Sequence, residues 1–327
     1  MSGNTKYDFE TMVQVAKMYY QKEMNQQDIA KTFGWSRSMV SMILSEAKES
    51  GIIEVRIHDL TSNDEELSGQ LKQRFGLQDC IVVPTSATSL PLLLKIVAGQ
   101  AASFAAKELR NHSVVGMAWG TTCQEFMSAF PENSNLVDVN VVPLIGGSAR
   151  ISLEYQLNEM VRMFAEKLKG IPSFIYAPSM GDTMEDKMLY MKSLYMQDIA
   201  ARWKRMDTVI ISVGAPPEYY AGQLNLDPFE MREKFLENPQ RPVGDIHAHR
   251  ITYGGQFLNL DYDNRLICAE EADLRNARKV ICVAAGKHKA LSIIGALRLN
   301  LIHSLITDAA TARIVLELLD SEPKNPN

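Results

Sequence analysis

Residues 26–43 read QQDIAKTFGWSRSMVSMI, and this stretch restricts most strongly what the N-terminal part of the chain can be. Its apolar residues recur where two crossed helices bury a shared face, and the small Ala30 allows close approach. Gly34 predicts a left-handed turn between the helices, and Ser36 is a typical N-cap for a second helix that Gly51 closes. Together these features predict a helix-turn-helix. A helical hairpin without function would explain the apolar spacing but not the turn, the cap and the polar leading edge together.

The second helix of this pair presents polar side chains at its N-terminal end, the part of a recognition helix that enters a major groove. The residues predicted to contact DNA are Gln27, Ser36, Arg37, Ser38 and Ser41. Residues 1–58 hold seven basic and seven acidic side chains, so this segment lacks the basic excess of a strong non-specific DNA binder. A DNA-binding segment without net charge can still bind DNA when several copies act together. The neutral charge leaves a second hypothesis open, in which these helices bind another protein.

The composition is that of an ordinary globular protein with two domains. The chain has 327 residues, of which 46% are hydrophobic and 22% charged, and its net charge is −5. No continuous apolar run reaches the length of a bilayer span and no signal-peptide pattern is present, so we expect a cytoplasmic protein without a membrane partner. Four scattered cysteines without a CxxC motif indicate buried thiols, not disulfides or a metal site.

The domain boundary is expected where the chain becomes polar and acidic, at DLTSNDEE. Before it, apolar spacing predicts a supporting helix between Phe9 and Tyr20, and the alternation IIEVRI predicts a short strand or wing at Ile52–Ile57. We therefore predict a helix-turn-helix domain at residues 1–58, a linker at 59–66, an effector-binding domain at 67–320 and a flexible tail at 321–327.

The larger domain alternates between apolar β-branched runs and segments of helical period. The runs predicted as strands are Cys80–Val83, Ser113–Ala118, Val137–Leu144, Phe174–Tyr176, Thr208–Val213, Val280–Ala284 and Leu301–Ile306. The predicted helices include Leu67–Phe75, Leu92–Leu109, Leu157–Leu168, Met188–Lys204 and Ala309–Leu319. Apolar strands separated by helices predict an α/β fold with a mainly parallel, Rossmann-like sheet covered on both faces.

Ligands of such sheets bind beyond the carboxyl ends of the strands, so the turns that follow the strands are the candidate site. Five turns carry suitable residues: WGTT (119–122), PLIGGS (143–148), SVGAPP (212–217), VGDI (243–246) and AAGKHK (284–289). A glycine and two hydroxyls at a helix N-terminus suit an anion, a lone carboxylate suits vicinal hydroxyls, and a lysine suits a phosphate. The candidate effector-binding residues are Gly120, Thr121, Thr122, Gly146, Gly147, Gln156, Asp245 and Lys289. Together these residues offer the groups that would bind a phosphorylated sugar.

Other chemistry has little support in the sequence. His247 and His249 form an HxH pair, but no third ligand stands at a recognisable spacing, so no metal and no cofactor is predicted. The hydrolase, P-loop and dinucleotide motifs GxSxG, GxxxxGK[ST] and GxGxxG are absent. A phosphosugar isomerase or deaminase with an added helical module remains the alternative. Such an enzyme needs a catalytic base, and Asp245 alone is a weak candidate for it.

The order of these motifs resembles one family. A helix-turn-helix joined to an α/β domain with GMAWGTT (116–122), PLIGG (143–147), SVGAPP, GDI (244–246) and AAGKHKA (284–290) resembles the SorC/DeoR-type sugar-binding transcriptional regulators of bacteria, over about residues 7 to 320. The resemblance implies a winged-type DNA-binding domain and an effector domain with the fold of glucosamine-6-phosphate deaminase and ribose-5-phosphate isomerase. It also implies dimers or tetramers on palindromic operator DNA.

The resemblance further implies a role for each candidate residue. Gly120, Thr121 and Thr122 would hold a phosphate, and Lys289 would contact the phosphate or another anionic edge. The sugar would be lined by Gly146, Gly147 and Gln156, with Asp245 on its hydroxyls. Ile145 stands where a polar or basic side chain would suit a charged ligand, so a less charged sugar or polyol stays open. The sequence thus predicts a repressor of a sugar or polyol catabolic operon that is controlled by its effector.

Overall fold

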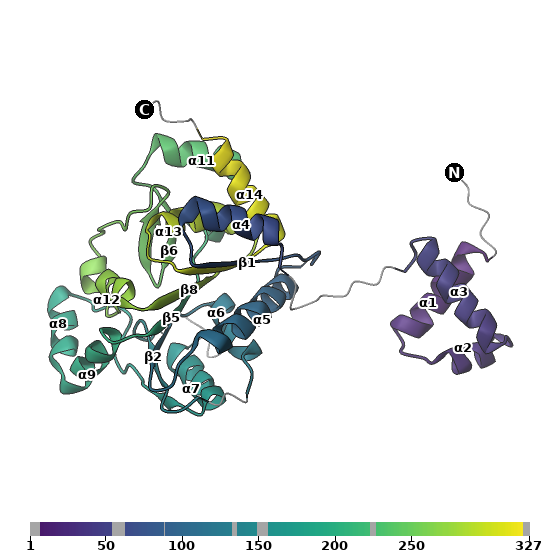
Figure 1. Ribbon diagram of the computed structural model, residues 1–327, viewed down its shortest axis with the longest axis horizontal. Helices are drawn as coiled ribbons and strands as arrows, with labels where there is room; N and C mark the ends of the chain where they lie inside the picture. The colour runs from purple at the N-terminus through teal and green to yellow at the C-terminus, as the bar shows by residue number, and fades with distance from the viewer. Residues whose placement is uncertain are drawn as a thin grey trace. The chain divides into compact units, whose positions relative to one another are not determined.

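The chain folds into two compact units, Met1–His58 and Asp59–Asn327 (Figure 1). The computed structural model describes residues 7–53, 63–87, 89–132, 136–148, 156–222 and 227–322. Most of the predicted wing at Ile52–Ile57 and of the tail at 321–327 lies outside these residues. Each unit has a hydrophobic core of its own.

The first unit contains three helices whose N-termini are each capped by a polar side chain. These helices are α1 (Phe9–Tyr20), α2 (Gln26–Phe33) and α3 (Arg37–Glu49). Asp8, Asn25 and Ser36 accept hydrogen bonds from backbone N–H groups of the first turns. Gly34 ends α2 with a φ of +70°, and its N–H donates to the carbonyl oxygens of α2. The glycine thus turns the chain directly into the cap of α3.

The core of the first unit lies between the three helices. It is made of Met12, Val15, Ile29, Ala30, Val40, Ile43, Leu44 and Ala47. Beside the turn, the rings of Phe33 and Trp35 stack with their centroids 4.3 Å apart. Because the apolar residues of α2 and α3 face inward, the polar residues at the start of α3 face solvent.

The second unit is built on a parallel sheet of seven strands, in the order β1-β9-β8-β5-β2-β3-β4. Its strands are β1 (Asp79–Val83), β2 (Val114–Met117), β3 (Asn140–Pro143), β4 (Ile171–Pro172), β5 (Thr208–Ile211), β8 (Lys279–Val283) and β9 (Ser304–Asp308). A separate antiparallel hairpin joins β6 (Pro242–Ile246) to β7 (His249–Thr252). The expected mixed α/β architecture with a mainly parallel sheet is confirmed.

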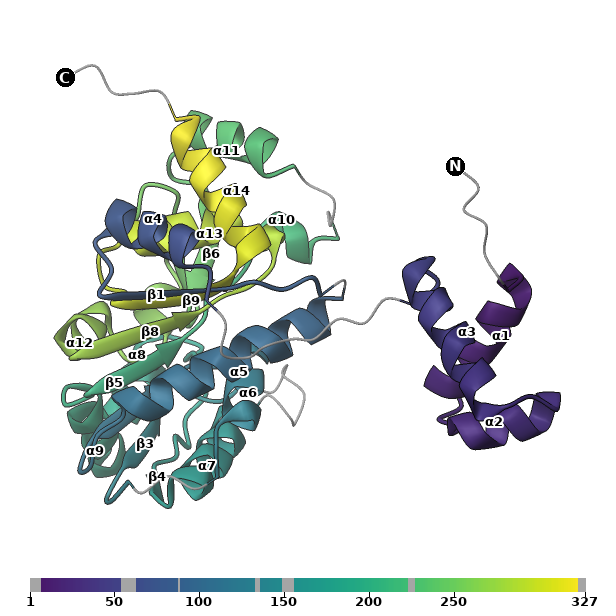
Figure 2. The same cartoon turned by 45° about the vertical axis from the view of Figure 1, so that its right-hand side comes forward.

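Helices pack around this sheet (Figure 2). They are α4 (Glu65–Phe75), α5 (Leu90–Glu108), α6 (Thr121–Ala129), α7 (Leu157–Leu168), α8 (Met184–Lys192), α9 (Leu194–Trp203), α10 (Pro217–Tyr220), α11 (Pro228–Glu237), α12 (Glu271–Asn276), α13 (Ala290–Arg298) and α14 (Ala309–Asp320). Helices α4 and α14 lie side by side next to β1, and α5 packs against β1, β8 and β9. Short 3-10 turns occur at Asp263–Arg265 and Lys287–Lys289.

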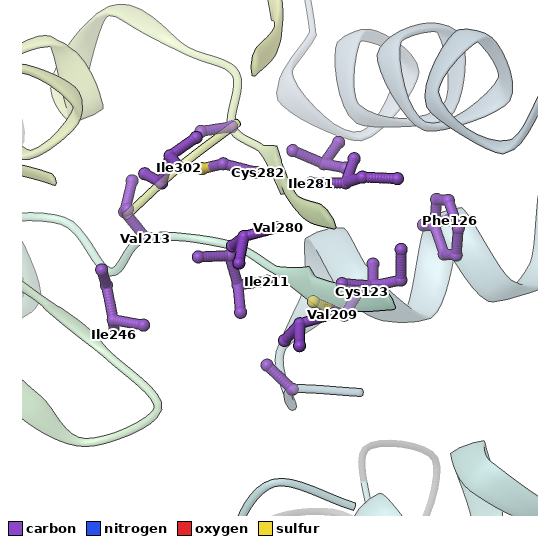
Figure 3. Packing of buried hydrophobic residues seen from close by; sticks show 14 of the residues in the cluster. Cys123, Phe126, Val209, Ile211, Val213, Ile246, Val280, Ile281, Cys282 and Ile302 are labelled. Carbon is purple, nitrogen blue, oxygen red and sulfur yellow. The ribbon is translucent and has the colours of Figure 1, made fainter. Parts of the chain in front are cut away.

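The central strands are fully buried, which explains their continuous apolar runs. Every residue of β5, β8 and β9 is buried. Figure 3 shows part of this core, with Val209 and Ile211 of β5, Ile281 of β8 and Phe126 of α6. All four cysteines are buried and free and belong to this core, and Figure 3 labels Cys123 and Cys282. The core holds the ends of neighbouring strands in fixed positions.

Helix α5 is the one described helix that is long and apolar enough to cross a membrane. No continuous apolar run of the sequence is long enough for a span, because Lys95 and Gln100 interrupt this one. In the structure, eight residues of α5 are buried against the sheet and neighbouring helices. A core helix of this kind meets the same criteria of length and composition.

Two predicted elements differ from the structure, and one observed element was not predicted. The strand predicted at Phe174–Tyr176 lies instead at Ile171–Pro172, because the amide of Asn158 binds both backbone groups of Ile175. The helix predicted at Met188–Lys204 is two helices, since Ser193 is extended and caps the second one. The hairpin of β6 and β7 was not predicted.

Candidate functional site

A cavity of about 260 Å³ lies at the carboxyl ends of β2, β5 and β8. Its lining comes from the turns after these strands and from the hairpin of β6 and β7. The lining residues are Trp119, Gly120, Thr121, Thr122, Ser212, Val213, Gly214, Tyr220, Asp245, His247, Arg250 and Lys289. Four of the five predicted segments therefore contribute to one cavity. Three are turns after strands of the parallel sheet, as expected, whereas residues 243–246 are not a turn but part of strand β6.

The N-terminus of α6 forms one wall of the cavity. Gly120 precedes the helix with a φ of +112°, a backbone conformation that side chains resist. Thr121 and Thr122 are the first two residues of the helix. The first N–H groups of a helix have no partner within it and carry the positive end of the helix dipole. This wall can therefore hold an anion by backbone N–H groups and two hydroxyls.

Lys289 brings a cation to the same wall. Its Nζ lies 3.4 Å from Oγ1 of Thr122 and 3.5 Å from Oγ of Ser212. Burial lowers the pKa of the Lys289 ammonium, and the nearby thiols of Cys123 and Cys282 and the carboxylate of Asp245 act in the opposite direction. An anionic ligand would favour the charged form of this lysine.

Asp245 and Arg250 bring a carboxylate and a guanidinium to the same cavity. They are register partners on the hairpin, and Nη1 of Arg250 lies 3.7 Å from Oδ1 of Asp245. Burial raises the pKa of the Asp245 carboxyl, while Arg250 and the N–H of Ala248 lower it. A Cβ at Gly214 would lie 2.1 Å from Oδ1 of Asp245, so only glycine leaves room for this carboxylate.

The turn of the hairpin is strained. His247 and Ala248 have φ values of +36° and +81°, which two-residue hairpin turns require but residues other than glycine, asparagine and aspartate rarely adopt. His247 is buried, and burial lowers its pKa to about 3. The turn fixes the register that places Asp245 opposite Arg250.

Five of the eight predicted effector residues line the cavity: Gly120, Thr121, Thr122, Asp245 and Lys289. Gly146, Gly147 and Gln156 are not part of its lining. A Cβ at Gly146 would lie 2.2 Å from the carbonyl oxygen of Pro178, and the N–H of Gly147 donates to the Ala177 carbonyl.

The paired glycines therefore admit another segment of this chain. Gln156 donates through its amide to the carbonyl oxygen of Ser148, at 2.8 Å, in the part of the chain that follows the glycines. All three residues still lie beyond the carboxyl end of β3, at the same edge of the sheet as the cavity.

Tyr220, His247 and Arg250 also line the cavity but were not proposed from the sequence. Arg250 could be found only by recognising the hairpin, because its neighbour Asp245 is five positions away on the paired strand. The turn between them contains no glycine or asparagine, which is the usual signal for a hairpin. Tyr220 belongs to the short helix α10, and its hydroxyl accepts a hydrogen bond from the N–H of Ala215.

The residues predicted to contact DNA are all exposed on the first unit: Gln27, Ser36, Arg37, Ser38 and Ser41. Gln27 and Arg37 line the same surface hollow between the starts of α2 and α3. The Ser36 hydroxyl is already used, because it accepts from the N–H of Met39 and lies 2.9 Å from the Ser38 hydroxyl. Met42, one turn after Ser38, is also exposed.

Comparison with known proteins identifies the family. The family model described as "Putative sugar-binding domain" matches residues 60–317, which is most of the chain. The chain belongs to the SorC/DeoR-type sugar-binding transcriptional regulators. The matched range contains every residue that lines the cavity.

Members of this family match over nearly their full length. The sorbitol operon regulator of Klebsiella pneumoniae is 27% identical over 312 residues, covering 95% of this chain and 98% of the relative. The deoxyribonucleoside regulator of Bacillus subtilis is 28% identical over 304 residues, covering 93% and 96%. The crystal structure of the full-length regulator SorC from Klebsiella pneumoniae superposes with a TM-score of 0.70, covering 95% of this chain and 99% of that one.

These SorC/DeoR-type relatives are transcriptional regulators. The comparisons give no support to the alternative of a phosphosugar isomerase or deaminase. The two relatives are named for different compounds, one for a polyol and the other for a deoxyribonucleoside. Membership of the family therefore shows that the chain is a sugar-binding regulator. Which ligand it binds has to be inferred from the residues that line its cavity.

Proposed function

We propose that this regulator is a cytoplasmic repressor that binds palindromic operator DNA through its first unit and a sugar, sugar phosphate or polyol in the cavity of its second unit. The observation that carries this proposal is the convergence of an anion-binding helix terminus, a lysine and a carboxylate–arginine pair in one cavity. The domain limits follow, with residues 1–58 reading DNA, 59–66 linking, 67–320 binding the effector and 321–327 forming a tail.

The cavity has a distinct place for each part of a phosphorylated sugar. A phosphate at the start of α6 would meet free backbone N–H groups, the hydroxyls of Thr121 and Thr122 and the ammonium of Lys289. Asp245 would accept hydrogen bonds from vicinal hydroxyls, and Arg250 would donate to a ring or hydroxyl oxygen. The volume of about 260 Å³ is just below that of typical drug-sized pockets and suits a single monosaccharide.

Gly146, Gly147 and Gln156 remain part of this proposal as residues at the rim. They follow β3, the neighbour of β2, so a movement of their segment would change the edge of the cavity. The proposed fold of the larger unit is that of the glucosamine-6-phosphate deaminases and ribose-5-phosphate isomerases. Their shared use of strand-end turns for a phosphosugar supports this proposal by analogy.

The first unit supports DNA reading by its shape. Helices α2 and α3 joined through Gly34 match a helix-turn-helix, and we propose a winged-type arrangement with α3 in the major groove. Arg37 and Ser38 would contact bases or phosphates, together with Gln27 and Ser41. Ser36 would act mainly as the cap of α3, and the exposed Met42 could meet a thymine methyl group.

Coupling between the units would run through a homo-oligomer, a dimer or a tetramer. Two half-sites of a palindromic operator must be met at matching helical phase, so a small rotation between subunits changes the affinity for DNA. An effector that binds one arrangement better shifts the population toward it. We propose that occupancy of the cavity releases the operator.

Ligand screening tests the cavity. In a thermal-shift panel of sugar phosphates, sugars and polyols, at least one compound should raise the melting temperature of the full chain, because a ligand that binds only the folded state stabilises it. Asp245→Asn should abolish the shift of that compound. Asp261→Asn, at a carboxylate outside the cavity lining, is the matched control. A compound that shifts the melting temperature of Asp245→Asn as much as that of wild type would refute the proposed site.

Operator binding tests the first unit. Arg37→Ala should weaken binding to the operator by tenfold or more while the effector still binds, because a bidentate arginine contact to a base contributes about 1–3 kcal/mol. Lys48→Ala, at the far end of α3, is the control. Equal binding by wild type and Arg37→Ala would instead favour a protein partner for these helices.

Absence of turnover with every compound that binds would separate this regulator from an isomerase or deaminase.

A further inference from the structure

His247 and His249 meet a third potential metal ligand that lies 19 positions further along the chain. Nε2 of His249 lies 3.2 Å from Sγ of Cys268. The rings of the two histidines are nearly perpendicular, with their centroids 5.2 Å apart. One ligating atom from each of the three residues lies within 4.8 Å of the other two. His247 and Cys268 are buried, so this is an enclosed cluster rather than a surface group.

The second ring nitrogens of both histidines have partners of the kind found around metal sites. Nε2 of His247 lies 3.1 Å from the carbonyl oxygen of Ala269. Nδ1 of His249 lies 3.4 Å from Oδ1 of Asp263. Metal-binding histidines usually donate their other ring N–H to a backbone carbonyl or a carboxylate, which orients the ring. His247 is oriented in that way by its hydrogen bond, and the carboxylate of Asp263 lies within ion-pair distance of His249, whose Nε2 faces the Cys268 sulfur.

Nδ1 of His247 has no hydrogen-bond partner among the described residues. The residue is only 2% exposed, so solvent does not supply one either. A purely structural cluster, in which the Cys268 thiol donates to His249, does not satisfy this atom. An unsatisfied buried polar atom costs about 1–3 kcal/mol in folding free energy. A metal ion bound to Nδ1 would remove this deficit.

We propose that His247, His249 and Cys268 form a site for a Zn²⁺ ion. Tetrahedral zinc takes nitrogen and sulfur ligands at about 2.0–2.3 Å, so its ligand atoms stand roughly 3.3–3.6 Å apart. The separation of 3.2 Å between Nε2 and Sγ is about 0.1 Å below this range. The widest separation, up to 4.8 Å, closes with a shift of about 1 Å in a side chain.

The electrostatics around the cluster favour a cation on balance. Binding replaces the thiol proton of Cys268 with the metal and releases that proton to solvent. Asp263 and Glu270 lie beside the cluster and Lys187 opposes them, all three in the cavity that His249 and Cys268 also line. This cavity gives the ion a route in and leaves its fourth position to water or to Glu270.

The site would join two segments that the backbone connects only loosely. The histidines belong to the hairpin that carries Asp245 and Arg250, and Cys268 forms a bridge to Ile145, next to the paired glycines. A bound ion would therefore fix the hairpin against the turn that follows β3. The proposal concerns metal binding by the chain itself and does not depend on DNA binding or on the effector.

Metal titration of the full chain tests the site. After chelator treatment, the protein should take up one Zn²⁺ per chain in competition with a chromogenic chelator. Cys268→Ser should weaken this binding at least tenfold, and Asp263→Asn should weaken it by about 10–100-fold by releasing His249. Cys80→Ser, at another buried cysteine outside the cluster, should bind as wild type does.

Cobalt spectroscopy supplies a readout that a structural role would not change. Co²⁺ bound by wild type and Cys80→Ser should show thiolate-to-metal charge-transfer absorption, and Cys268→Ser should lack it. The absence of that band in wild-type protein, or an equal zinc affinity in wild type and Cys268→Ser, would overturn the proposal. Should Cys268→Ser fail to fold, His249→Gln takes its place in the titration, and loss of uptake is again the supporting result.

Discussion

The missing side chain of Gly214 makes room for a buried carboxylate, and this leads to a prediction about one methyl group. Gly214→Ala would place Cβ 2.1 Å from Oδ1 of Asp245. We expect the substitution to lower the free energy of unfolding by about 1–3 kcal/mol, the usual cost of overpacking, and to abolish effector binding. Gly69→Ala is the control, since a Cβ there meets nothing within 4 Å on helix α4. The control should gain about 0.5–1 kcal/mol in chemical denaturation, and a loss at Gly69 alone would contradict this account.

His288 stacks on Tyr219 with ring centroids 4.3 Å apart and predicts a pH effect. Burial, followed by the charge of Lys289, lowers its pKa to about 4 from 6.5. The unfolded chain therefore binds a proton first as the pH falls, and stability contributed by neutral His288 is lost between about pH 6.5 and 4. The loss is below about 1.4 kcal/mol per pH unit, since the ring is partly exposed.

His288→Asn should remove this part of the pH dependence in thermal melts recorded from pH 7.5 to 4.5. The same substitution at His112, which is exposed, serves as the control. Parallel losses of stability with falling pH in wild type and His288→Asn would show that the ring does not carry the effect.

Helix α3 depends on the hydroxyl of Ser36, which accepts a hydrogen bond from the Met39 N–H at 3.2 Å. Ser36→Ala leaves that N–H without its cap, and we expect a loss of about 1 kcal/mol in the stability of the helix. Amide hydrogen exchange in residues 37–49 should then become about fivefold faster. Ser45→Ala, at an exposed position within the same helix, should leave exchange nearly unchanged. An equal effect at both positions would exclude capping as the cause.

Elements with a clear period could be predicted from the sequence. Helix α7 has the predicted bounds, Leu157–Leu168, because its apolar residues repeat at helical spacing between polar segments. The hairpin of β6 and β7 could not be predicted, since the turn His247-Ala248 lacks the residues that favour its positive φ values. Tertiary structure supports this turn: the buried His247 ring is hydrogen-bonded to a segment far along the chain.

The same limit applies to the candidate site. Residues that follow a strand could be proposed because the carboxyl ends of parallel strands share one edge, and Thr121 and Lys289 do line one cavity. Asp245 lines the same cavity but belongs to strand β6 of the separate hairpin, so the expectation of a turn after a strand was wrong for it. A glycine after a strand predicts a close approach without saying what approaches. At Gly146 the neighbour is the carbonyl of Pro178, which no local pattern reveals.

The whole molecule exposes apolar side chains on α8 and α9, which predicts where subunits meet. Leu189 and Leu194 are 73% and 85% exposed, and Met184 and Met188 are also exposed. Such residues commonly mark a protein interface. Leu194→Asp should lower the mass measured by light scattering after size-exclusion chromatography while the fold survives. Leu236→Asp on α11 is the control, and an unchanged mass for Leu194→Asp would place the interface elsewhere.

The burial of all four thiols has a practical consequence for observing the proposed coupling. Burial raises the pKa of each thiol to about 12, so the reactive thiolate is scarce at neutral pH. A new cysteine at the exposed Lys31 would then be the preferred target of a maleimide dye. Energy transfer between labelled subunits would then report the distance between their two DNA-binding units in real time as effector is added.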